Sequence, residues 1–109
     1  MNPYFALVGT DGSLTEVSAS SSGDDLRVLV GDWLEGIDAK DGSELSGYVD
    51  EEATLKEGIP HNRLASILLG VVVLGPAVLT GGCGSDGDDL GLSHPQWRHV
   101  REVAASLTA

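Results

Sequence analysis

Apolar and polar residues alternate in two pairs of short segments of this chain. The first pair is 1–9 with 14–17, the second is 34–39 with 44–50, and an Asp-Gly step lies between the members of each pair. A period of two is typical of a β-strand, and Asp-Gly favours a tight turn because both residues tolerate positive φ. The pattern therefore predicts two β-hairpins.

Between the hairpins the spacing of apolar residues changes to that of a helix. The apolar positions are Leu26, Leu29, Val30 and Trp33. Ser22 ends a polar loop and is placed to cap the helix, acidic residues occupy the first turn, and Gly31 is a plausible stop. We expect a short amphipathic helix here.

The C-terminal segment 93–107 carries a stronger helix signal. Ser93 and Gln96 have the spacing of a capping box, and Pro95 fits the first turn. One apolar stripe follows, formed by Trp97, Val100, Val103, Ala104 and Leu107. This helix is expected to pack on the sheet.

The longest aliphatic run, 64–80, has three possible interpretations. It follows an arginine and precedes Cys83, as in a bacterial lipoprotein signal, but that signal belongs at an amino terminus. A membrane span is the second possibility, yet Gly70 and Gly75-Pro76 interrupt the run. The third interpretation, which we favour, is a helix ending near residue 69 and two buried strands, 71–74 and 77–80, as a central pair.

These elements predict one α+β domain over residues 1–109. We expect a mostly antiparallel sheet of about five to six strands built from hairpins. Two to three helices are expected with it, including the amphipathic C-terminal helix at about 93–107.

The large excess of acidic residues makes some classes of binding partner unfavourable. Seventeen acidic residues against six basic ones give a formal net charge of −11. That field repels phosphate, so direct nucleic-acid binding is not expected, and neither is an anionic membrane surface. The acids either keep the protein in solution or form a face that docks on a basic protein.

No cofactor or metal is expected from the residue spacing. Cys83 has no partner cysteine, and the three histidines do not have metal-ligand spacing with it. The glycines of 82–87 spell G-x-G-x-x-G, a dinucleotide-binding pattern, but acids stand on the phosphate side and no helix pattern begins before Ser93. We interpret this segment as a surface loop.

Three sequence blocks carry a family resemblance: LRVLVGDWLEGIDA, YVDEEATLKEGIPHNRLAS and VVVLGPAVLTGG. In order and spacing, over roughly residues 5 to 90, they resemble the small uncharacterised domains (domain of unknown function family 3846) of actinobacterial phages, plasmids and related mobile elements. The matching positions are Val30-Gly31, Leu34, Glu35, Glu51-Glu52, Gly58-Ile59-Pro60, Asn62 and 71–82. Asp32 and Trp33 depart from the family pattern of a second glycine and a tyrosine.

The resemblance implies a phage or mobile-element origin and action in the cytoplasm of the host cell, with no established activity. If there is a site, it is expected where the family blocks converge. The candidate binding residues are Gly31, Trp33, Glu35, Glu51, Asn62 and Arg63. Four of them also have a structural interpretation: Gly31 can end a helix, Trp33 can fill the core, Glu35 can be a strand-edge acid and Asn62 can cap a helix.

Two functions from different classes remain open. The first is a protein that binds a host or phage protein through an acidic or aromatic face and modulates a host defence or regulatory factor. The alternative is a small-molecule or nucleotide-binding domain with a site around Glu35 and Asn62. No catalytic pairing such as Ser-His-Asp has local support, so an enzyme is the minority interpretation, and a homo-oligomer is left open.

Overall fold

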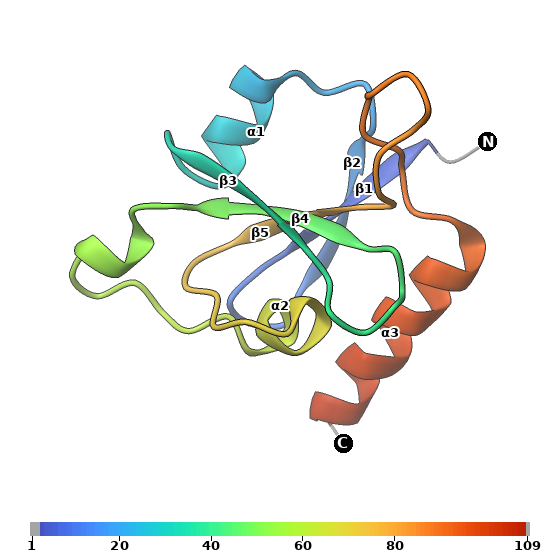
Figure 1. Ribbon diagram of the computed structural model, residues 1–109. Coiled ribbons are helices and arrows are strands. Elements are labelled where there is room, and N and C mark those ends of the chain that lie inside the picture. Colours follow the sequence, from blue (N-terminus) through green and yellow to red (C-terminus); the bar gives the residue numbers. More distant parts are fainter. Residues whose placement is uncertain (1–2, 109) are drawn as a thin grey trace.

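Five antiparallel strands form one sheet at the centre of the computed structural model, which describes residues 3–108 (Figure 1). The strand order across the sheet is β2-β1-β5-β4-β3. The strands are β1 (Tyr4–Val8), β2 (Leu14–Ser18), β3 (Leu34–Asp38), β4 (Ser46–Asp50) and β5 (Ala77–Thr80). The prediction of a hairpin-built antiparallel sheet is confirmed, although residues 1–2 of the first predicted strand lie outside the described residues.

The last strand joins the two hairpins. β1 pairs with β2 and β3 pairs with β4, as the alternation predicts, and β5 lies between β1 and β4. Val78 is opposite Leu7 on one side and opposite Tyr48 on the other. β5 is buried along its whole length, so the prediction of a central strand over 77–80 is confirmed.

The strand predicted over 71–74 is wrong. Gly70 ends the preceding helix in the left-handed conformation, at φ 77°, and turns the chain away. The amide of Val73 then donates to Ser66 Oγ at 2.8 Å, and Val72 is 78% exposed. Within 71–74 only Leu74 forms a β-bridge, and this isolated bridge joins it to His61. β-branched residues favour a strand only where a neighbouring strand is present to pair with them.

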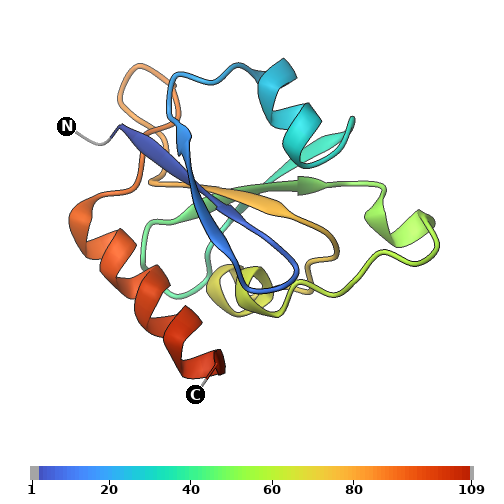
Figure 2. The ribbon, with the colours of Figure 1, turned by 180° about the vertical axis from the view of Figure 1, so that it is seen from behind.

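Three α-helices cover the sheet: α1 (Gly23–Leu29), α2 (Arg63–Leu69) and α3 (His94–Thr108), with a short 3₁₀ turn η1 (Ala53–Leu55) beside β4. Figures 1 and 2 show α1 on one side of the sheet and α2 and α3 on the other. The cores follow this division, because alternate strand residues face opposite sides. Phe5 and Val78 pack with Leu26 under α1, whereas Ala6 and Leu79 belong to the larger core under α2 and α3.

The helix ends follow the predicted caps in part. Ser22 and Asp25 form a capping box at α1, and Ser93 with Gln96 forms one at α3. α1 ends at Leu29 with Val30 as its C-cap, directly before Gly31, so the predicted stop at Gly31 is confirmed. Trp33 therefore lies beyond the helix and is 60% exposed, which corrects its place on the buried stripe.

No helix within residues 3–108 is long and apolar enough to cross a membrane. The aliphatic run contains α2, of seven residues, followed by the turn at Gly70 and then β5. The glycine-rich segment predicted as a surface loop is one: residues 82–90 fold back on themselves, and Leu90 N donates to Gly82 O at 2.8 Å. We call this segment the acidic loop.

Candidate functional site: a cleft between α1 and the acidic loop

Four of the predicted site residues lie near the start of β3. Trp33 directly precedes this strand and Glu35 is its second residue. The carbonyl oxygen of Trp33 accepts a hydrogen bond of 2.7 Å from the amide of Glu51. Gly31 has a positive φ of 155°, and a Cβ added there would lie 2.6 Å from Asp50 Oδ2, so a side chain is excluded at this position. The glycine therefore permits close packing between the end of α1 and the end of β4.

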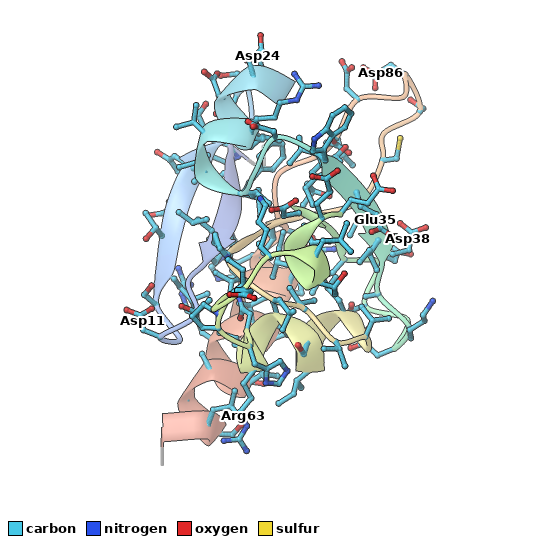
Figure 3. The ribbon with its side chains drawn as sticks, turned by 90° about the vertical axis from the view of Figure 1, so that its left-hand side faces the viewer. Asp11, Asp24, Glu35, Asp38, Arg63 and Asp86 are labelled. Carbon is cyan, nitrogen blue, oxygen red and sulfur yellow. The ribbon has the colours of Figure 1, made fainter. Side chains whose placement is uncertain are left out.

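Asn62 and Arg63 are elsewhere. Figure 3 shows Glu35 and Arg63 at widely separated places on the molecule. Asn62 is completely buried, and its amide nitrogen donates to Val8 O at 3.0 Å and to Gly75 O at 2.8 Å. Its oxygen caps α2 by accepting from Ala65 N at 3.1 Å. Both N–H groups of the amide are thus engaged with the protein, which gives Asn62 a structural role.

A concave site that the candidate residues do not include lies on the α1 side of the sheet. It is a cleft with a volume of about 480 Å³. Its lining comes from the sheet (Phe5, Leu34, Tyr48), from the serine loop and α1 (Ala19, Ser20, Ser21, Gly23, Leu26) and from the acidic loop (Asp88, Asp89). The sheet and α1 supply an apolar surface, whereas the loops supply hydroxyl and carboxylate groups.

One hydrogen bond joins the sheet to the acidic loop across the cleft. Tyr48 Oη donates to Asp89 Oδ2 at 2.5 Å. The hydrogen bond to this carboxylate, together with partial burial, raises the pKa of Tyr48 to about 12. The phenol therefore stays protonated at neutral pH, and it fixes Asp89 at the edge of the cleft.

The cleft is acidic without an internal counter-charge. None of its lining residues is Lys, Arg or His. None of the ion pairs within residues 3–108 involves a residue that lines the cleft; they join Arg27 to Asp24, Lys56 to Asp50 and His99 to Asp41. Figure 3 shows Asp86 of the acidic loop at the same end of the molecule as Asp24 of α1, but Asp24 is paired with Arg27, so the uncompensated carboxylates are those of the acidic loop. A cationic group is therefore the ligand that this cleft favours electrostatically.

The described residues hold no group of three or more His, Cys, Asp or Glu side chains arranged for a metal ion. Cys83 is exposed and unpaired. Of the two serines in the cleft, Ser20 has its hydroxyl 2.7 Å from the hydroxyl of Ser18, which does not activate it as a nucleophile.

Only some of the residues that line the cleft could have been predicted from the sequence. Tyr48 alternates with Gly47 and Val49, so the hairpin pattern places it on the face opposite to that of its neighbours. Its partner Asp89 is 41 residues away in a loop without periodicity, and nothing in the local sequence joins the two. The predicted cap at Ser22 also brings the serines before it to this face.

The Tyr48–Asp89 contact predicts an alkaline signature. In the folded protein one tyrosine is expected to ionise only near pH 12, and Tyr48→Phe removes that step from an ultraviolet absorbance titration. Because the folded-state pKa is raised, the stabilisation is complete below the unfolded value of about 10 and is lost as the pH rises through about 12. Ionisation of Tyr48 at its ordinary pH in the folded state would contradict the contact.

Comparisons of the chain with protein-family models, with curated proteins and with solved structures found no match. The resemblance to the phage and mobile-element domains thus stays a prediction. A functional proposal for this chain depends on the geometry and charge of the cleft.

Proposed function

We propose that this protein is a binding protein that takes a basic segment of a partner protein into the cleft between α1 and the acidic loop. The observation that carries the proposal is the pairing of an apolar cleft surface with two carboxylates, Asp88 and Asp89, that have no cationic partner within residues 3–108. An acidic docking face was one of the two functions expected from the sequence.

Each part of the cleft matches a part of such a segment. Lysine and arginine carry a positive group on an aliphatic stem, and the stem packs on apolar surface while the charge stays near water. Here the half-buried side chains of Leu34 and Tyr48 supply apolar surface, and the carboxylates lie on the acidic loop beside it. A phosphate-bearing ligand is disfavoured by the same carboxylates and by the net charge of −11.

The family resemblance supplies the proposed setting. A small phage or mobile-element protein acting inside the host cell would meet host and phage proteins, and the partner we propose is one of these. Occupation of a basic site on a host defence or regulatory factor would modulate that factor. The alternative, a small-molecule site around Glu35 and Asn62, lacks support because the Asn62 amide is buried and engaged.

The proposal can be tested with a defined probe, a short peptide of alternating arginine and leucine, titrated into isotope-labelled protein. We expect amide shift changes concentrated at Ser20, Ser21, Tyr48 and Asp89, with weaker binding at higher salt. The double variant Asp88→Asn, Asp89→Asn should bind roughly three- to tenfold more weakly, since two partly exposed ion pairs are removed.

A matched control separates the cleft from net charge. Glu16→Gln with Glu102→Gln removes two exposed acids on β2 and α3 and changes the total charge equally. Neither residue lines the cleft, and Glu16 is opposite Ala6, which belongs to the core on the other side of the sheet. This variant should bind within about twofold of the unaltered protein. Equal weakening by both double variants, or shift changes spread evenly over the surface, would show that only overall charge attracts the peptide.

A further inference from the structure

A second groove lies on the opposite side of the sheet, at α2. It has a volume of about 440 Å³, and its apolar lining comes from Ile67 and from the turn residues Val71 and Val72. Ile67 is 48% exposed and Val72 is 78% exposed. Single exposed apolar residues are common, but these lie together in one depression, which favours a docked apolar group.

Two cationic side chains lie beside this groove, and neither is in an ion pair within residues 3–108. Arg63 lines it, and Lys40 lies against the turn, because a Cβ added to Gly70 would be 2.9 Å from Lys40 Cγ. Neither makes an ion pair with a carboxylate within residues 3–108, whereas Arg27 and Lys56 do. The groove has no acidic residue in its lining. It is therefore opposite in charge to the cleft under α1.

The groove is also built on a fixed frame. The Ser66 hydroxyl lies 3.1 Å from His61 Nε2 and accepts the amide of Val73 at 2.8 Å, so it joins both sides of the depression. Gly70 supplies the left-handed turn that presents Val71 and Val72. A surface that keeps its shape loses little entropy on binding.

We propose that this groove binds an acidic amphipathic segment of a partner protein, in which aliphatic side chains are flanked by carboxylates. The aliphatic groups would contact Ile67 and Val72, and the carboxylates would pair with Arg63 and Lys40. This inference is independent of the cleft on the α1 side. The cleft is lined by α1 and the groove by α2, and these helices lie on opposite sides of the sheet (Figures 1 and 2). Both surfaces could therefore be occupied together, and the protein would bridge two partners.

The test uses a synthetic helical peptide with leucine at positions i, i+3, i+4 and i+7 and glutamate elsewhere, measured by calorimetry against the whole chain. Val72→Asp should weaken binding by about tenfold or more, because it places a charge in the apolar contact and repels the peptide. Arg63→Glu should do the same. Both residues are exposed, so neither change is expected to unfold the protein.

Two control variants and a control peptide test whether the effect is specific to the groove. Val28→Asp alters an equally exposed valine on α1, and Arg98→Glu alters an exposed arginine on α3; both should leave affinity within about twofold. The same peptide with lysine in place of glutamate should bind only at the cleft on the α1 side, so its affinity should be unchanged by Val72→Asp and Arg63→Glu. Absent binding of the acidic peptide, or equal effects of Val72→Asp and Val28→Asp, would overturn the proposal. So would concentration-dependent self-association abolished by Val72→Asp, because the occupant would then be a second copy.

Discussion

Asn62→Asp is expected to lower the free energy of unfolding by about 3–5 kcal/mol at neutral pH, close to the whole stability of many domains. The new carboxylate still caps α2, since it can accept the Ala65 amide. It cannot donate, however, so Val8 O and Gly75 O lose their partners and face a buried negative charge. The measurement is chemical denaturation followed by circular dichroism.

The pH dependence of Asn62→Asp gives the same prediction a second test. Burial and two facing carbonyl oxygens raise the folded-state pKa of the introduced carboxyl group above its unfolded value of about 4. The stability deficit should therefore shrink as the pH falls from about 7 toward the unfolded value of about 4, because the group takes up a proton and can donate again. Ser22→Asp places the same residue at an exposed cap and should change stability by less than about 0.5 kcal/mol. A deficit independent of pH would assign the loss to something other than the missing donors.

Leu26→Ala is expected to cost about 2–4 kcal/mol and to loosen α1. α1 has seven residues, too few to be stable without tertiary packing, and Leu26 is its deepest anchor at 4% exposure. Its side chain belongs to the small core with Phe5 and Val78. Hydrogen exchange should show faster exchange throughout α1, with α2 and α3 much less affected.

The loss of this anchor should also reach the proposed binding site, because Leu26 lines the cleft. We expect Leu26→Ala to reduce affinity for the arginine and leucine peptide while affinity for the acidic peptide at α2 is retained. Val28→Ala is the control within the same helix: Val28 is 86% exposed, and its removal should change stability by less than about 0.5 kcal/mol. Unchanged exchange in α1 would mean that other contacts hold the helix.

Local signals predicted most of the architecture. The two hairpins, the caps at Ser22 and Ser93 and the strand 77–80 were each encoded within a few residues of one another. The prediction of a strand over 71–74 was wrong because the β-branched residues there have only a preference for strand structure. Pairing also needs a neighbouring strand, and the turn at Gly70 directs the chain away from one.

The site was less predictable, because it depends on contacts between distant segments. The structure places Gly31, Trp33 and Glu51 where β3 begins and β4 ends, whereas Asn62 is buried at the N-terminus of α2. A buried asparagine with three hydrogen bonds and one that recognises a ligand look the same in a sequence. The Tyr48–Asp89 contact depends on how the acidic loop folds back over the sheet, which composition does not reveal.

The position of β5 has a consequence for how the chain folds. Its neighbours in the sheet, β1 and β4, both precede it in sequence, and β1 precedes it by about seventy residues. During synthesis both hairpins emerge first and have no shared strand, so their inner edges stay open to other chains until residues 77–80 arrive. We therefore expect folding to be limited by insertion of β5. A fragment ending at residue 70 should aggregate rather than form half of the domain.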